Sequence, residues 1–204
     1  ALSRYPTVSK IQFLECSGNS GTQAILPKPR QGSVSDLHGL ISCSEWGGIL
    51  LSTLLEETGL KKNAKWIIAG GSDSAMMSRS IPIDKALDDA MIALYQNGER
   101  IRPSNGYPMR LFLPGWEGNA SVKWLTSLKV TSSPAMAKDE TSKYSDTLDT
   151  GISELFTFPM SVKSLITSPS PGLDLHEKGV YQISGIAWSG AGKIKNVEIS
   201  TDGG

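Results

Sequence analysis

Short stretches with apolar residues at alternate positions recur along the first part of the chain. Near its start, Ile11 and Phe13 have the spacing that places side chains on one face of a β-strand. Residues 65–69 form a short apolar run that leads into a Gly-Gly-Ser-Asp loop ending at Asp73, which is typical of a buried strand. Further strands are predicted over residues 91–95, 109–113 and 122–130.

Helical spacing is clearest after Ser44, which can cap a helix N-terminus, and it ends at Gly59. The apolar residues that recur at this spacing are Trp46, Leu50, Leu51, Leu54 and Leu55. A second, shorter helix is predicted from Asp84 to Ala90. Helices interspersed among strands indicate an α+β fold.

The composition changes toward the C-terminal end. Residues 132–153 are rich in Ser, Thr, Lys, Asp and Glu, as in a linker or a solvated excursion, and we place a domain boundary near Thr150. The predicted domains are residues 1–150 and 151–204. In the second, period-two stretches between Gly and Pro turns predict the start of an antiparallel β-sandwich: residues 161–166, 179–185 and 195–200. Because the chain opens in a strand and stops at a turn signal, we expect the natural protein to continue beyond both ends.

Charge and length narrow the function classes. The chain has 204 residues, 39% of them hydrophobic, which suffices for one large or two small domains. Lys and Arg total 20, as do Asp and Glu, so no net charge favours nucleic acid or an acidic membrane. No apolar run approaches the roughly 20 residues that cross a bilayer. We therefore expect neither nucleic-acid nor membrane binding.

The two cysteines, Cys16 and Cys43, cannot form a disulfide framework, although one disulfide is possible, and they lack zinc-site spacing. The chain has no Cys-x-x-Cys-His motif, so no c-type haem is expected in it. Its two histidines are too few for a histidine-based metal site. We expect His176 to be a surface residue and His38 to lie on the substrate side of a pocket.

Cys16 follows the first predicted strand and opens a run of small, turn-forming residues. A thiolate there could bind a soft or high-valent metal, but the same position also fits an inert buried cysteine. The glycine-rich turn at residues 114–119 is a second candidate site.

The segment Cys16-Ser17-Gly18-Asn19 is similar to the molybdenum-binding segment of sulfite oxidases. Further similarities follow in order: Trp46-Gly47-Gly48, Gly71-Ser72-Asp73, Ser80-Ile81-Pro82, Asn97-Gly98, residues 106–110, Pro114-Gly115 and residues 121–125. Residues 185–190 and 197–204 resemble the opening of that family's immunoglobulin-like dimerisation domain. Within the family, the chain is most similar to the catalytic subunits of bacterial Sox-system sulfane dehydrogenases.

This resemblance implies a sulfite-oxidase-type molybdopterin-binding domain followed by a partial immunoglobulin-like β-sandwich dimerisation domain. The implied cofactor is molybdenum-molybdopterin, with Cys16 as the protein ligand of the metal. Positions that match pterin-contacting residues of the family are Asp73, Asn105, Arg110, Ser121, Val122 and Lys123. Arg110 and Lys123 suit the pterin phosphate, and Asp73 and Asn105 suit its polar edge.

Three departures from the family pattern bear on the substrate. Met77 stands where sulfite oxidases have an active-site tyrosine, Gly21 where they have an arginine, and Asn105 where they have a histidine. Losing a cation and a phenol should weaken binding of a small dianion and make room for a longer or carrier-bound sulfur substrate. Arg79 and Lys193 are the candidates for the remaining positive charge, and either could also be an ordinary surface residue.

The resemblance implies oxidation of a reduced sulfur compound, with electrons passed to a separate c-type cytochrome. It also implies a homodimer and a periplasmic location. Alternatives of the same fold are direct sulfite dehydrogenation and another oxo-transfer reaction such as nitrate reduction. A different class remains open, a binding or dimerisation module with a degenerate cofactor site.

Overall fold

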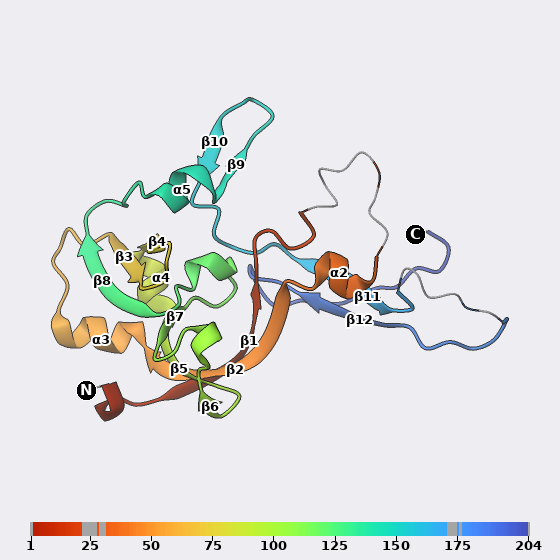
Figure 1. Ribbon diagram of the computed structural model, residues 1–204, viewed down its shortest axis with the longest axis horizontal. Coiled ribbons are helices and arrows are strands. Elements are labelled where there is room, and N and C mark those ends of the chain that lie inside the picture. The colour runs from red at the N-terminus through yellow and green to blue at the C-terminus, as the bar shows by residue number, and fades with distance from the viewer. Residues whose placement is uncertain (1, 22–27, 29–31, 171–174, 176, 204) are drawn as a thin grey trace.

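The structure is a computed structural model that describes residues 2–21, 28, 32–170, 175 and 177–203. Figure 1 shows a large lobe of strands and helices joined to a narrower extension formed by β11 (Lys163–Ser168) and β12 (Ser184–Trp188). Strands β1 (Val8–Glu15) and β2 (Ile41–Leu50) run from the large lobe toward this extension. The end of β1 therefore lies where the two lobes meet.

One sheet is antiparallel and has the strand order β1-β2-β5-β6, with β7 also paired to β5. The additional strands are β5 (Met91–Gln96), β6 (Glu99–Arg100) and β7 (Arg110–Phe112). Asn97 and Gly98 form the β5–β6 turn, with the positive φ angles of 52° and 77° that a tight hairpin turn requires. Gly48 is needed where β2 meets β5, because a Cβ there would lie 2.1 Å from the Ile92 carbonyl oxygen.

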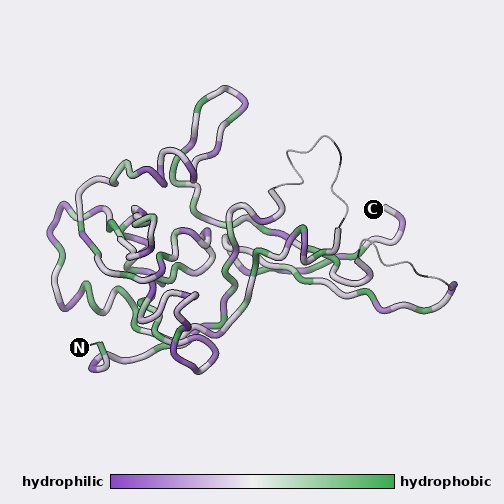
Figure 2. The backbone as a smooth tube through the Cα atoms, viewed as in Figure 1, coloured by the Kyte–Doolittle hydropathy of each residue, from purple (hydrophilic) through white to green (hydrophobic). Residues whose placement is uncertain are grey.

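A second antiparallel sheet has the order β4-β3-β8, formed by β3 (Trp66–Gly71), β4 (Ser78–Pro82) and β8 (Leu125–Thr131). Helices α3 (Leu51–Thr58) and α4 (Ile83–Asp88) pack on each other. The main apolar core joins both sheets and both helices through buried side chains such as Leu51, Leu55, Ile67, Ile81, Ala86, Ile92 and Leu111. Figure 2 shows apolar stretches in this lobe and also along β11 and β12.

The helix predicted from Ser44 begins seven residues later, at Leu51, and residues 44–50 belong to β2. Trp46 pairs across the sheet with Lys10 and Gln96, and its ring stacks on Phe112 with 4.7 Å between centroids. Pairing on both edges outweighs the helical spacing of the apolar residues, and two glycines after Trp46 disfavour a helix. The predicted stop is confirmed, because the helix ends before Gly59, whose φ is 72°.

The segment predicted as a linker or excursion carries α5 (Lys138–Ser142), β9 (Ser145–Thr147) and β10 (Ser153–Leu155). Helix α5 is anchored to the large lobe, since Glu140 is completely buried and bonded to Arg79 and Ser80 of β4. The composition of this segment alone cannot show that one of its carboxylates pairs with an arginine far away in the sequence. The part of this segment around α5 is therefore integral to the first lobe.

In the narrower extension, which we call the second lobe, β11 and β12 pair antiparallel, with Lys163 opposite Trp188. Residues 179–183 and 195–200, predicted as strand, are outside the strands of the described structure. Phe13 of β1 packs with Met160 and Trp188 in a small core that joins the lobes. The boundary at Thr150 stays a prediction.

The remaining short elements are η1 (Leu2–Arg4), α2 (Val34–His38), η2 (Pro103–Asn105) and η3 (Gly118–Ala120). Among the described residues, no helix combines the length and apolar character needed to cross a bilayer.

Candidate active site

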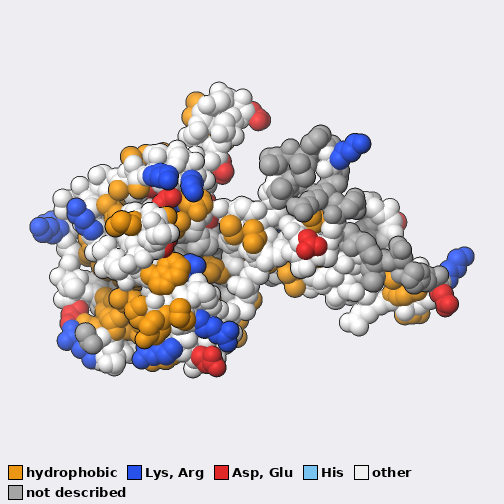
Figure 3. Space-filling model, viewed as in Figure 1, with side chains coloured by type: hydrophobic (Ala, Val, Ile, Leu, Met, Phe, Trp, Pro, Cys, Tyr) orange, Lys and Arg blue, Asp and Glu red, His pale blue; other side chains and the backbone are white. Residues whose placement is uncertain are grey.

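A cleft of about 550 Å³ opens beside the end of β1. Six of the residues proposed from the sequence line it: Cys16, Asp73, Asn105, Arg110, Ser121 and Lys123. They come from positions more than a hundred residues apart in the chain. Figure 3 shows acidic and basic side chains scattered over the face of the large lobe that it draws, in keeping with the zero net charge of the chain. The polar character of the cleft therefore comes from its own lining residues and not from an overall charge.

Cys16 is an exposed free thiol in the loop after β1. Its backbone N–H donates to the Leu40 carbonyl at 2.9 Å, and its carbonyl accepts from the Asn19 N–H at 2.9 Å. The buried Asn19 side chain donates to Glu15 at 3.0 Å and accepts from the Leu40 N–H at 3.1 Å. The turn is therefore fixed by hydrogen bonds on both sides of a thiol that remains accessible, which excludes the inert buried cysteine.

The glycine-rich turn at residues 114–119 packs against this loop. A Cβ at Gly118 would lie 2.9 Å from the Glu15 carbonyl oxygen, so only glycine allows this approach. The Asn119 amide donates to Glu117 at 2.6 Å and to Ser17 at 3.3 Å. The two loops that the sequence suggested separately thus form a single site.

Arg110 is a buried cation on β7, with 4% of its surface exposed. Its two terminal nitrogens donate to the carbonyls of Asn105 at 3.1 Å and Ser121 at 2.7 Å, while its buried Nε has no hydrogen-bond partner among the described residues. No described carboxylate forms an ion pair with it. Burial lowers the pKa of Arg110 to about 10.

Lys123 lies close enough to Arg110 to be affected by its charge. Burial first, and then Arg110, lower the pKa of Lys123, and Asp73 opposes them. Lys123 Nζ donates to the Ser104 carbonyl at 3.0 Å, and Asp73 accepts from the Met77 N–H at 2.8 Å. This edge of the cleft therefore holds two cations and one carboxylate, an arrangement that suits an anionic group.

The other three pterin-side candidates differ in their position. The Asn105 side-chain amide donates to Gln96 at 2.7 Å, and Asn105 lines the cleft. The Ser121 hydroxyl accepts from the Leu113 N–H at 3.0 Å, while Val122 is buried in the main core and does not line the cleft. Only the backbone of Val122 could therefore contribute to binding.

The two proposed substrate-side cations are not in the cleft lining. Arg79 is completely buried, donates to Glu140 at 3.1 Å and bonds Asn119, which does line the cleft. Lys193 is exposed in the second lobe, after β12, and is not among the lining residues. Arg79 can thus act on the cleft only through its neighbours.

Other residues singled out by the sequence lie around the cleft. Met77 lines it, and Gly21 is exposed. His38 Nδ1 is 2.6 Å from the Ser20 hydroxyl, next to the lining residue Gly39, and His176 lies outside the described residues.

Sequence reasoning missed Tyr144, which also lines the cleft. Its ring lies over the Arg79 guanidinium, 4.7 Å from ring centre to Cζ. Burial raises the pKa of the Tyr144 phenol, and Arg79 opposes this. The available signal was that Tyr144 is the single aromatic residue in the polar stretch at residues 132–153.

The donor set fits a metal carried by an anionic organic cofactor. In the described part of the chain, no group of three or more His, Cys, Asp or Glu side chains could hold a metal. A metal at Cys16 would thus need most of its ligands from elsewhere. The unpaired Nε of Arg110 supplies a charged donor for the anionic part of such a cofactor.

Comparisons with known proteins agree with this arrangement. The family model described as oxidoreductase molybdopterin binding domain matches residues 1–138, and the Mo-co oxidoreductase dimerisation domain matches residues 154–204. Sulfite oxidase of Gallus gallus is 30% identical over 220 residues, covering 99% of this chain and 48% of that protein. An NADH nitrate reductase of Ulva prolifera is 28% identical over 235 residues, covering 100% of this chain and 27% of that protein.

Among solved structures, the sulfane dehydrogenase SoxCD from Paracoccus pantotrophus superposes with a TM-score of 0.90 and 41% identity. The match covers 95% of this chain and 50% of that chain. The chain therefore spans about half, or less, of the length of these relatives.

Proposed function

Since the chain belongs to the oxidoreductase molybdopterin-binding domain family, which it shares with the sulfite oxidases, we propose that it forms the catalytic part of a molybdenum enzyme oxidising reduced sulfur. The observation that carries the proposal is the cleft in which the exposed Cys16 thiol shares a lining with the buried, unpaired Arg110. The family's cofactor is molybdenum-molybdopterin. When bound, it supplies the two-electron redox chemistry of sulfur oxidation.

Each cleft residue has a role that its own contacts support. The Cys16 thiolate binds the metal, held in place by the turn hydrogen bonds of Asn19. Arg110 and Lys123 bind the pterin phosphate, since neither is paired with a carboxylate in the described structure. The polar pterin groups are bound by the side chains of Asp73, Asn105 and Ser121 and by the backbone of Val122.

On the substrate side we propose a sulfane sulfur compound, either free or attached to a carrier, as the preferred substrate over sulfite. Met77, in the loop before β4, lines the cleft at the position that we match to the family's tyrosine, so this position supplies no phenol. The relative with 41% identity is named a sulfane dehydrogenase. Arg79, acting through Asn119 and Tyr144, and Lys193 remain the proposed sources of positive charge.

We further propose that electrons leave to a separate c-type cytochrome in the periplasm, as the resemblance to the Sox-system sulfane dehydrogenases implies. Residues 154–204 match a dimerisation domain, which supports a homodimer.

Steady-state assays separate the proposal from its rivals. The protein, expressed from its complete natural coding sequence in a molybdenum-replete host, is supplied with a sulfane donor or sulfite together with oxidised cytochrome c, or with nitrate together with a reduced electron donor. We expect the highest kcat/KM with the sulfane donor. Preference for sulfite supports the direct dehydrogenase, and turnover of nitrate alone supports the nitrate-reducing alternative.

A degenerate module predicts a different result, namely a folded dimer that takes up no molybdenum and oxidises none of these compounds. Cys43→Ser is the matched control for variants of Cys16, because Cys43 is the other exposed free thiol.

A further inference from the structure

We propose that the second lobe is a part of the metal site, because Glu15 connects β11 and β12 to the Cys16 turn and fixes the position of the thiol. This inference rests on the proposed function, in which Cys16 is the metal ligand. It gives the second lobe a role in addition to dimerisation, with Glu15 as a positioning residue.

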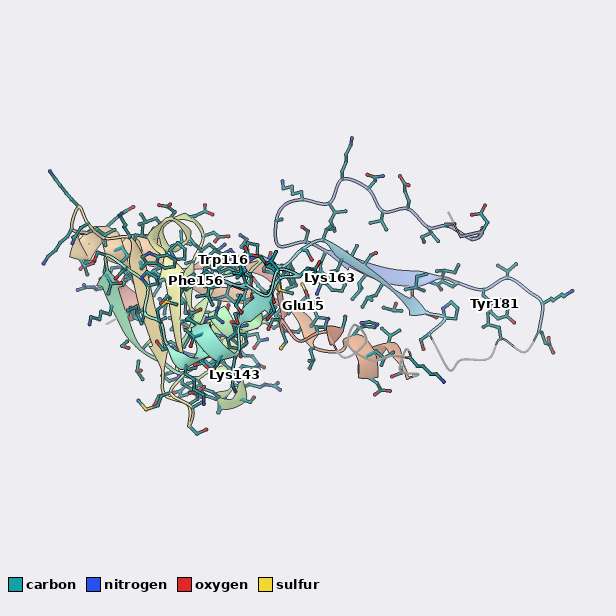
Figure 4. The ribbon with its side chains drawn as sticks, turned by 90° about the horizontal axis from the view of Figure 1, so that it is seen from above. Glu15, Trp116, Lys143, Phe156, Lys163 and Tyr181 are labelled. Atoms are coloured by element: carbon teal, nitrogen blue, oxygen red, sulfur yellow. The ribbon has the colours of Figure 1, made fainter. Side chains whose placement is uncertain are left out.

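Glu15 is the last residue of β1 and is completely buried, although a glutamate at a strand end normally faces solvent. Lys163 Nζ donates to its Oε1 at 2.8 Å, and Trp188 Nε1 donates to its Oε2 at 2.6 Å. Figure 4 shows Glu15 beside Lys163 at the narrow junction between the lobes. Both donors come from the second lobe.

The same carboxylate holds the Cys16 turn. Asn19 Nδ2 donates to Glu15 Oε1 at 3.0 Å, and the Asn19 N–H donates to the Cys16 carbonyl at 2.9 Å. Glu15 is also bonded covalently to Cys16. Cys16 is therefore held on one side by the Glu15 backbone and on the other by Asn19, whose side chain is bonded to the Glu15 carboxylate. The remaining partners of that carboxylate lie in the other lobe.

On the second lobe, the two donors are a cross-strand pair, because Lys163 lies opposite Trp188 in the β11–β12 register. Trp188 is 7% exposed and packs on Phe13 of β1. Nearby, a Cβ at Gly190 would meet the Gly115 carbonyl oxygen at 1.9 Å, so the two lobes are in backbone contact. These contacts fix the distance between the β11–β12 hairpin and the Cys16 turn.

Removing either donor leaves a buried carboxylate partly unsatisfied, and it must then reorient toward water or its remaining donors. Because Asn19 shares that carboxylate, the Cys16 turn moves with it. A change at Lys163 or Trp188 should therefore alter the accessibility of Cys16 from the far side of the junction.

The test uses the complete protein without its cofactor, in a Cys43→Ser background, so that Cys16 is the single thiol of this chain. The rate of Cys16 alkylation by iodoacetamide is followed by mass spectrometry at fixed pH. We expect Lys163→Met and Trp188→Phe to change this rate by at least about threefold, the effect of losing one hydrogen bond. Lys163→Arg should restore the wild-type rate, because it keeps the ion pair.

The control is Thr167→Val, which removes the Thr167–Ser184 hydrogen bond of the same hairpin and does not touch Glu15. Unchanged alkylation in both Lys163→Met and Trp188→Phe, with circular dichroism showing folded protein, overturns the proposal. Equal changes in Thr167→Val overturn it too, since the effect would then reflect general loosening of the hairpin. Absence of molybdenum from wild-type protein would instead contradict the proposed function. The alkylation rates are measured without cofactor, so they test the role of Glu15 separately.

Discussion

Arg79 of β4 and Glu140 of α5 form a completely buried ion pair, with 3.1 Å between Arg79 Nε and Glu140 Oε1. Glu140 also accepts the Ser80 N–H at 2.7 Å. This pair holds α5 on the large lobe and places Tyr144, just after that helix, at the cleft. The stability of the first lobe and the composition of the candidate site therefore depend on the same contact.

Replacing Glu140 should destabilise the protein strongly. Glu140→Ala leaves Arg79 buried without its carboxylate, which we expect to lower the free energy of unfolding by about 3–5 kcal/mol. Urea denaturation measures this. The matched control is Glu57→Ala, which removes an exposed ion pair with Arg4 and should cost no more than about 1 kcal/mol. Similar losses in both variants would show that the buried pair has no special role.

Tyr144 should affect substrate binding and leave cofactor binding intact. Its hydroxyl has no hydrogen-bond partner among the described residues and is available to the cleft. We expect Tyr144→Phe to keep the wild-type molybdenum content and to lower kcat/KM for the sulfur substrate about fivefold, the effect of one hydrogen bond of about 1 kcal/mol. Steady-state kinetics with metal analysis checks this, and unchanged kcat/KM would remove Tyr144 from the site.

Arg110 should be needed for anion binding and should contribute little to stability when no anion is bound. Arg110→Met removes a buried cation without a carboxylate partner, but it also removes the donors to the Asn105 and Ser121 carbonyls, and these two effects on stability oppose each other. The cofactor-free variant should therefore be within about 2 kcal/mol of wild type, while cofactor affinity should fall about 10- to 100-fold. Thermal unfolding with added inorganic phosphate gives a second readout, with stabilisation of wild type but not of Arg110→Met. Lys129→Met, at an exposed position of β8, is the control. Equal phosphate stabilisation in Arg110→Met would contradict this role.

Glu117 should give the stability a measurable pH dependence. Burial raises the pKa of Glu117 above 4.5, although hydrogen bonds from Asn119 and Thr157 oppose the shift. The folded protein thus holds this proton more tightly than the unfolded chain, so the contribution of Glu117 to stability is greatest at low pH and declines as pH rises through the folded pKa.

Glu117→Gln removes that titration. The stability of the variant relative to wild type should therefore increase as the pH rises above 4.5, the ordinary pKa of the carboxyl, as measured by urea denaturation. A difference that stays constant across this range would show that Glu117 does not titrate there.

The family and the α+β fold class predicted from the motifs are confirmed by the matches over residues 1–138 and 154–204. Local signals sufficed for β3, β5 and the helix stop at Gly59. They failed at Trp46, which was predicted to be helical but lies in a strand that pairs on both edges. They also failed at residues 138–147, which were predicted as a linker but carry a helix held by the distant Arg79.

The site shows the same division. Cys16, Arg110 and Lys123 were found because each belongs to a recognisable motif, whereas Tyr144 and Glu15 were missed. Glu15 is a charged residue in an alternating strand, and only Lys163 and Trp188, which follow it by 148 and 173 residues, explain its burial. No local pattern carries information of that range.

Molybdenum content tests the central claim most directly. Wild type, Cys16→Ser and Cys43→Ser are expressed from the complete natural coding sequence in the same molybdenum-replete host, and metal is measured by elemental analysis. We expect about one molybdenum per chain in wild type and Cys43→Ser, and, in Cys16→Ser, an altered visible spectrum with loss of sulfur oxidation, because the thiolate ligand is gone. Absence of molybdenum from wild type, or an unchanged spectrum and activity in Cys16→Ser, would contradict the account.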